Sequence, residues 1–380
     1  MNAHLEFRTS SKATTKPATE GRLAGRVAEE QGQIPERIAA ARKSFVTRRV
    51  DFRDAKALIR ARAPRAGDLV LARVNSIGHH GRLETPAGRR SKLYCGDEII
   101  VAYGARYAPD QFEADVPSDL EPCDLVAGGG IAARMVSRHA KVGRPTRITP
   151  IALLADGRAR PLNLSRYAIQ PPRSPTPRPP VIAVAGSSMN AGKTTAAAAL
   201  IHGLSRAGLT VAGTKATGTG SGGDLWSMAD AGADQVFDFT DMGHASTAGL
   251  SLSFLEEIVR GLILQVSELG SDVIILELAD GIFQRETASL LQSHLFGDAI
   301  DGILFAAPDA LSATYGVDWL RTRNLPVLGI TGLMTASPLA TREAGANNDI
   351  AVATLENLAD PHFATKLCFG ATAKPPAAKV

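Results

Sequence analysis

The sequence predicts an α/β protein: a mostly parallel sheet with helices on both faces, preceded by a small β-rich barrel or sandwich domain and N-terminal helices. After residue 181, continuous apolar runs of strand length alternate with helical stretches, which is typical of parallel strands buried on both faces. From about residue 67 to 150, short strand-like runs are joined by glycine-containing turns, which favours an antiparallel module. Six prolines within residues 170–180 separate the two patterns.

Length, apolar content and cysteine usage limit the class of protein. A chain of 380 residues with 44% apolar composition can bury two or three cores. It has no apolar run long enough to cross a membrane and no signal-peptide pattern near Met1, so we expect a cytoplasmic protein without a membrane partner. The three cysteines are far apart and lack metal-ligand spacing, which favours reduced thiols.

Charge is divided unevenly along the chain. Residues 1–180 hold 31 Lys and Arg against 18 Asp and Glu, whereas residues 181–380 hold 11 against 20. The basic half could attract nucleic acid or an acidic substrate, or it could simply dock on the acidic half. Few aromatic residues argue against base stacking, so nucleic acid is the less favoured partner.

The composition shifts along the chain divide it into six segments. The N-terminal helices are expected from apolar positions such as Ile34, Ile38, Leu58 and Ile59. The segments are a disordered tail (1–20), a helical segment (21–65), a β-rich domain (66–165), a Pro-rich linker (166–180), the parallel-sheet domain (181–370) and a disordered tail (371–380).

Within the β-rich segment, two features have competing interpretations. His79-His80 could form a metal or acid–base element, but no third ligand lies nearby in sequence, so a polar hairpin tip is the favoured interpretation of the pair. Gly128-Gly-Gly130 predicts a tight turn or close backbone packing, because no apolar strand precedes it as a phosphate loop would need.

The sequence from Val181 to Thr195 predicts a nucleotide phosphate loop. An apolar strand runs into a glycine-bounded loop and then into an alanine-rich helix, so backbone N–H groups and the helix N-terminus can converge on an anion. Five residues separate the two glycines, where the common pattern has four. Strand candidates follow at 210–214, 272–277, 301–307 and 326–331. The residues expected at the nucleotide are Gly186, Asn190, Ala191, Gly192, Lys193, Thr194 and Thr195.

Acidic and basic side chains at the ends of two later strands are candidates for completing this site. Glu277 ends the apolar run that starts at Asp272, where a carboxylate can bind Mg²⁺, and Asp280 follows it. Lys215 and Asp224 bound a glycine-rich loop after the second strand. The simpler interpretations are a surface or N-cap-region carboxylate for Glu277, a helix N-cap for Asp224 and a solvated Lys215.

These motifs together resemble the dethiobiotin synthetase group of P-loop proteins, which includes the cobyrinate and cobyric acid synthase ATPase domains. The similarity covers roughly residues 181–335 and rests on the five-residue loop spacing, Thr214-Lys215-Ala-Thr217-Gly218 and Leu276-Glu277. It implies that Lys193 and Lys215 contact phosphates and that Thr194, Asp224 and Glu277 surround Mg²⁺. The chain also resembles poorly characterised bacterial P-loop proteins that carry a different N-terminal module.

The resemblance implies an ATP-dependent ligase that phosphorylates a carboxylate or carbamate for attack by an amine, with Lys193, Lys215 and Glu277 as catalytic residues. The chain departs from the family pattern at Leu278, where the family has glycine, and it lacks the Ser-Pro-His substrate segment, near Asp241 to Gly249 here. The diamine substrate is therefore not carried over. His244 or Asp280 could serve as base or substrate anchor, and His244 could equally be a hydrogen-bonded loop histidine.

Other functions with the same loop stay open at this point. A P-loop kinase would act on a small molecule or a nucleic acid 5′ end, and a nucleotide-gated switch or metallochaperone-type NTPase would transfer no phosphate to a substrate. Gly332-Leu-Met-Thr replaces the Asn-Lys-x-Asp of common GTPases, which favours ATP modestly. The expected ligands are ATP, Mg²⁺ and a small-molecule carboxylate or amine, and we expect a homo-oligomer.

Overall fold

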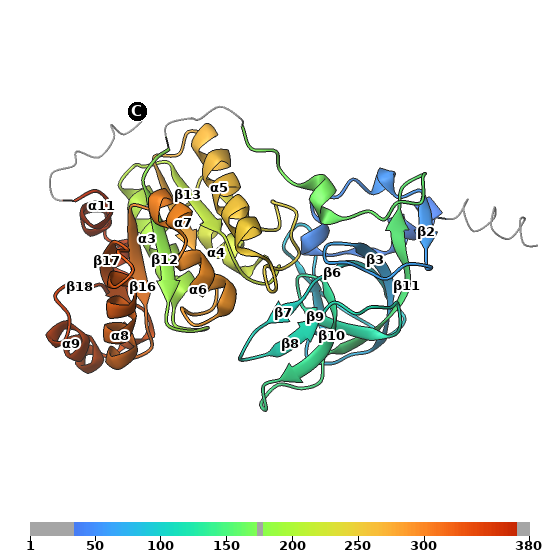
Figure 1. Ribbon diagram of the computed structural model, residues 1–380, viewed down its shortest axis with the longest axis horizontal. Helices are drawn as coiled ribbons and strands as arrows, with labels where there is room; N and C mark the ends of the chain where they lie inside the picture. Colours follow the sequence, from blue (N-terminus) through green and yellow to red (C-terminus); the bar gives the residue numbers. More distant parts are fainter. Residues whose placement is uncertain (1–33, 173–177, 371–380) are drawn as a thin grey trace, which may run out of the picture.

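The computed structural model describes residues 34–172 and 178–370 and shows two lobes (Figure 1). The first lobe is β-rich and the second is a sheet covered by helices. The predicted tails, part of the helical segment and the centre of the Pro-rich linker lie outside the described residues. Among the residues described, no helix is long and apolar enough to cross a membrane.

The first lobe is built around a closed β-barrel. Strands β3, β6, β10, β9 and β11 pair in a ring that returns to β3, and only the β6–β10 pair is parallel. The β7–β8 hairpin extends from β10, while β4 and β5 pair with each other. The strands are β1 (Arg42–Lys43), β2 (Ala57–Ile59), β3 (Leu69–Ser76), β4 (Arg82–Glu84), β5 (Arg90–Lys92), β6 (Glu98–Tyr103), β7 (Arg106–Tyr107), β8 (Phe112–Asp115), β9 (Cys123–Ala127), β10 (Ile131–Arg138) and β11 (Thr146–Ala155).

The helical prediction for residues 21–65 is wrong for most of the part that the structure describes. Only α2 (Ile34–Ala40) is an α-helix there, and short 3₁₀ turns η1 (Phe45–Thr47) and η2 (Phe52–Asp54) follow β1. Phe45 and Val46 are buried against the barrel, so tertiary packing overrides the helical propensity of this arginine- and alanine-rich stretch.

The second lobe contains a seven-stranded sheet in the order β14-β13-β15-β12-β16-β17-β18, and all its pairs are parallel. Continuous apolar sequence places both faces of its central strands in the core. This confirms the predicted strand positions, while β14 and β18 had no sequence signal. The strands are β12 (Val181–Gly186), β13 (Val211–Lys215), β14 (Gln235–Asp238), β15 (Val273–Glu277), β16 (Gly302–Ala306), β17 (Val327–Thr331) and β18 (Ala351–Val352).

Helices cover both faces of this sheet. Buried side chains of α3, α4, α10 and α11 form one core layer, and those of α5 to α9 form the other. The helical stretch from Arg285 to Ala299 is divided in two, because Ser293 caps a new helix by accepting from the Phe296 N–H. The helices are α3 (Lys193–Arg206), α4 (Gly223–Asp230), α5 (Leu252–Glu268), α6 (Arg285–Leu291), α7 (His294–Ala299), α8 (Ala310–Arg321), α9 (Pro338–Ala346), α10 (Leu355–Ala359) and α11 (Pro361–Phe369).

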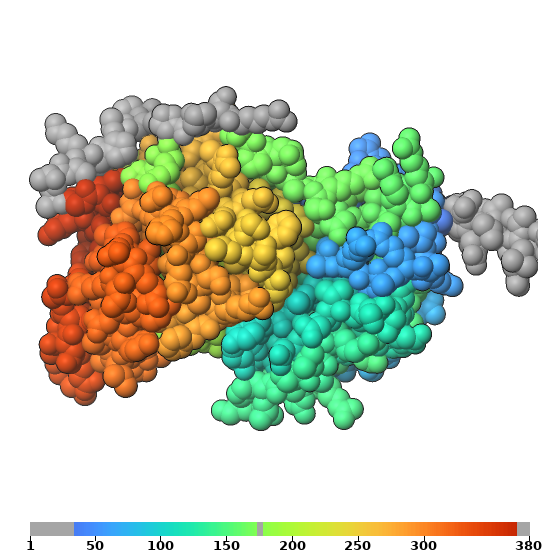
Figure 2. Space-filling view, in the orientation of Figure 1, coloured from blue at the N-terminus to red at the C-terminus, as the bar shows by residue number. Residues whose placement is uncertain are grey.

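A buried ion pair joins the two lobes. Arg48 of the first lobe lies 2.6 Å from Asp241 and 3.2 Å from Asp238 of the second, and it also contacts Thr240. Figure 2 shows the yellow surface around residues 240–250 against the blue and green surface of the barrel lobe. Because both carboxylates are almost fully buried, Arg48, with Arg49 3.7 Å from Asp241, provides the positive charge that makes their burial tolerable.

Replacing Arg48 with Met should lower the free energy of unfolding by about 3–5 kcal/mol, because it leaves buried Asp238 without an ion pair among the described residues and buried Asp241 with only Arg49, 3.7 Å away. Urea denaturation followed by circular dichroism measures this. Arg53→Met is the matched control, since Arg53 pairs with Asp51 at the exposed surface, and it should change stability by less than about 1 kcal/mol. Equal effects of the two substitutions would contradict the assigned role of Arg48.

Candidate functional site

The loop between β12 and α3 has the geometry of a phosphate loop. Gly192 has a left-handed φ of 98° directly before the first residue of α3, and Asn190 has a φ of 61°. At Gly186 a β-carbon would lie 2.8 Å from the Ala306 carbonyl, so only glycine fits where the loop leaves the sheet. The N-terminus of a 14-residue helix therefore opens at a loop that can approach an anion closely.

Lys193, the first residue of α3, is a buried cation where this loop ends. Its ammonium donates to the Ser188 carbonyl at 2.7 Å, which curls the side chain back over the loop. Desolvation lowers its pKa to about 8, while Glu277 and Asp280 oppose this shift. Lys193 is therefore still mainly protonated at pH 7 and can neutralise an anion.

The ends of two strands and the beginnings of two helices bring Thr194, Lys215, Asp224 and Glu277 together. The Thr194 hydroxyl donates to Glu277 at 2.8 Å and lies 3.3 Å from Asp224. The Lys215 ammonium contacts Asp224 and lies 3.8 Å from Glu277. These contacts arise because β13 and β15 are parallel neighbours, with Lys215 paired to Glu277 in register.

The simpler interpretations of these residues are wrong. Glu277 is 1% exposed and is no surface carboxylate. Gly222 occupies the N-cap of α4, and Asp224 lies in the first turn, facing Thr194. Lys215 bridges two carboxylates and is therefore no freely solvated lysine.

The donor set of this cluster fits Mg²⁺. A hydroxyl and two carboxylates are the hard oxygen ligands that this ion prefers, and it usually keeps several waters and needs few protein ligands. One Glu277 oxygen, Oε2, is buried without a hydrogen-bond partner. Thr194, Asp224 and Glu277 could therefore hold the ion.

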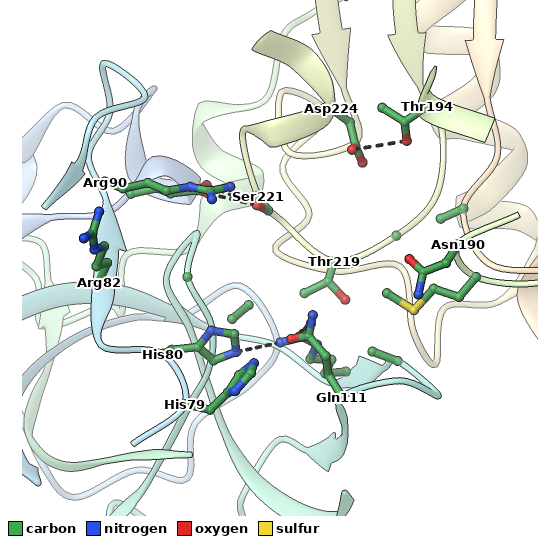
Figure 3. A pocket seen from close by; sticks show the side chains of 18 of the residues that line it. His79, His80, Arg82, Arg90, Gln111, Asn190, Thr194, Thr219, Ser221 and Asp224 are labelled. Carbon is green, nitrogen blue, oxygen red and sulfur yellow. Dashed lines mark hydrogen bonds and ion pairs between the residues drawn. The ribbon is translucent and has the colours of Figure 1, made fainter. Parts of the chain in front are cut away.

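A cavity of about 1360 Å³ lies between this cluster and the barrel. Figure 3 shows His79, His80 and Gln111 of the barrel across this space from Asn190, Thr194 and Asp224 of the second lobe. Four cationic side chains line the barrel wall: Arg82, Arg90, Lys92 and Arg106. Charged side chains of both lobes therefore face the phosphate loop across the cavity.

The barrel also holds the glycine-rich loop before α4 in place. Glu84 is 4% exposed and accepts from the Gly222 N–H at 2.7 Å and from the Ser221 hydroxyl at 3.1 Å. At Gly129 a β-carbon would lie 2.0 Å from the Gly220 carbonyl, which confirms the close backbone packing predicted for residues 128–130. The barrel therefore helps to position Asp224, two residues beyond Gly222.

The remaining candidates divide into those at the cavity and those away from it. Ala191 is buried, and Thr195 is exposed at the cavity. Asn190 bonds to Asp110 of the barrel at 2.8 Å, so its amide links the lobes. Asp280 lines the cavity, and burial raises its pKa to about 6.

Two histidine hypotheses find no support. His244 does not line the cavity and lies against Phe254, so it is neither the base nor the anchor. His79-His80 lies between β3 and β4, and the described ranges hold no group of three His, Cys, Asp or Glu side chains suited to a metal. The metal hypothesis for this pair therefore lacks its third ligand.

The barrel's contribution to this site has no motif in the sequence. Glu84, Arg106 and Gln111 belong to no motif, and their positions depend on how the barrel docks. The only signal was the excess of positive charge in the first half of the chain.

No protein-family model matches the chain, and no curated protein sequence matches it. Solved structures match about half of it at low identity. FtsY from Elizabethkingia anophelis with GDP is 14% identical over 54% of this chain and 67% of that chain (TM-score 0.35). A nucleotide-binding protein from Archaeoglobus fulgidus with ADP is 16% identical over 47% of this chain and 85% of that chain (TM-score 0.33). MinD from Pyrococcus horikoshii with Mg-ADP is 14% identical over 51% of this chain and 96% of that chain (TM-score 0.33).

Removing the Glu84 carboxylate should loosen the loop before α4. Glu84→Ala deletes a charged acceptor for Gly222 and Ser221, so amide hydrogen exchange over residues 220–224 should become roughly 10- to 100-fold faster. Mass spectrometry after deuterium exchange measures this. Glu113→Ala, on the exposed side of β8, should leave the segment unchanged, and the same exchange rate in both variants would contradict the role of Glu84.

Proposed function

We propose that this chain is a Mg-ATP-dependent enzyme that phosphorylates a carboxylate or carbamate, so that an amine can attack it and form a C–N bond. The observation that carries the proposal is the cavity, where the phosphate loop faces a cationic wall from another lobe. Its volume of about 1360 Å³ exceeds that of a typical small-molecule pocket and has room for a second substrate beside a nucleotide.

The chain's own residues are suited to phosphoryl transfer, which depends mainly on positioning and charge neutralisation. Lys193 and Lys215 would bind phosphate oxygens, and the N–H groups around Gly192 would orient them. Thr194, Asp224 and Glu277 would hold Mg²⁺, which supplies further positive charge at the phosphates. A lysine that leaves Asp224 for a phosphate would make that carboxylate available as a ligand.

The reaction has two steps. An acceptor carboxylate oxygen forms a bond to the γ-phosphorus of ATP as the bond from that phosphorus to the bridging oxygen breaks, and ADP leaves. The amine nitrogen then attacks the acyl carbon, and inorganic phosphate leaves. Asp280 would accept the amine proton, since a carboxyl with a pKa of about 6 is largely ionised at pH 7.

The resemblance to the dethiobiotin synthetase group supports the ligase over other phosphoryl transfers. A P-loop kinase is the second candidate, because the same cationic wall could hold a phosphate-accepting hydroxyl compound. Incubation with ATP and a panel of small acids and amines separates the two. A ligase should release ADP and phosphate only when acid and amine are both consumed, whereas a kinase should yield a stable phosphorylated product.

Lys193→Ala should reduce ATP turnover by at least about 100-fold while leaving the fold intact, because it removes the central phosphate-binding cation. ADP release and circular dichroism measure the two effects. Lys366→Ala removes an exposed lysine on α11 and should have no effect. Full turnover by Lys193→Ala would falsify the proposed function.

Asp224→Asn and Glu277→Gln should each raise the Mg²⁺ concentration needed for half-maximal turnover by about 10-fold or more, because each replaces a charged ligand with a neutral one. A magnesium titration of ADP release measures this. Asp230→Asn changes an exposed acid on the same helix as Asp224 and is the control. An unchanged titration for Asp224→Asn would remove Asp224 from the proposed metal site.

A further inference from the structure

Arg106 is a buried cation on the barrel wall of the cavity. It is 7% exposed, its Nη1 donates to the Val126 carbonyl, and its Nη2 donates to Gln111 at 2.8 Å. Its Nε has no hydrogen-bond partner. Within residues 34–172 and 178–370, no carboxylate forms an ion pair with it. Its hydrogen-bond partners orient the guanidinium, but none of them neutralises its charge.

Burial of a charge without a counter-charge is energetically unfavourable, and the pKa of Arg106 reflects this. Desolvation lowers its pKa to about 10. The acids that act on it are Asp110, which bonds to Asn190, and Asp280, which also interacts with Lys193. An anionic ligand at Arg106 would supply the missing charge.

His80 helps to hold this guanidinium while remaining uncharged. Its Nε2 lies 3.0 Å from Arg106 Nη1 and accepts a hydrogen bond from it when the ring proton is on Nδ1, while the Val126 carbonyl, 2.8 Å from Nε2, then accepts from Arg106. Burial, Arg106 and His79 lower its pKa to about 3, so it is neutral at physiological pH. Figure 3 places His80 and Gln111 on the barrel side, opposite Asn190 and Thr194. Arg106 is therefore a permanent cation framed by the neutral polar groups of His80 and Gln111.

We propose that Arg106, oriented by His80 and Gln111, binds a carboxylate of the acidic substrate on the barrel side of the cavity. This assignment rests on the proposed function, in which the phosphate loop takes the nucleotide and the acceptor enters opposite it. The guanidinium is planar, and its Nε and Nη2 hydrogens share one edge, which matches the two oxygens of a carboxylate. The exposed cations Arg82 and Lys92 at the same wall would attract such an acid into the cavity.

The test uses the full chain labelled with ¹⁵N-histidine and contains no nucleotide. Acetate, succinate, aspartate and inorganic phosphate are titrated while the His80 ring signal, assigned with His80→Gln, is followed. A carboxylate should shift this signal saturably, and Arg106→Gln should weaken binding roughly 10- to 100-fold. Arg134→Gln removes an arginine of the same barrel that does not line the cavity and should bind like the unchanged protein.

Each other outcome overturns a defined part of the inference. If no carboxylate shifts the His80 signal saturably in the unchanged protein, the inference that Arg106 forms a binding site is wrong. If only phosphate shifts the signal, the site binds an anion but the assignment to a carboxylate is wrong. If Arg106→Gln does not fold, Gln111→Leu serves instead: it keeps the charge but removes its orienting acceptor, and unchanged affinity would contradict the inference. Binding of a fluorescent ATP analogue is measured separately, so failure of the nucleotide site and failure of the carboxylate site are distinguished.

Discussion

The buried carboxylate of Glu277 is the constraint on which the site depends. A charge at the end of a central strand is tolerated only when cations and hydroxyls surround it, and Thr194 and Lys215 meet that need. Their positions follow from the parallel register of β12, β13 and β15, which ends three strands at one edge of the sheet. The parallel strand order therefore explains why the phosphate loop lies beside the cluster of Thr194, Lys215, Asp224 and Glu277.

The second constraint is that the barrel completes this edge of the sheet. In an open α/β sheet the carboxyl ends of the strands would face solvent, whereas here they face Glu84, Arg106 and the turn at His80. The barrel therefore covers part of this edge and places charged side chains opposite the phosphate loop.

The second lobe could be predicted well from sequence and the first lobe could not. Strands such as β15 are continuous apolar runs, and the loop at Gly192 has a fixed order of residue types, so local sequence determines both. The segment after Ala41 carries arginines and alanines typical of a helix, yet Phe45 and Val46 pack on the barrel, a long-range effect without local signature. Lys215, Asp224 and Glu277 were predicted because each stands at a strand or helix end, whereas Arg106 lies on a two-residue strand whose neighbours are set only by folding.

The contact between Gly129 and Gly220 has a mechanical consequence. Only backbone atoms of the two lobes meet there, so no side chain can rotate aside to make space, and the lobes are tightly packed at this point. A movement that widens the cavity between the lobes must therefore either rotate the lobes about this contact or break the contact. A side chain introduced at Gly129 would clash with the backbone of Gly220 and would therefore hold the two lobes further apart.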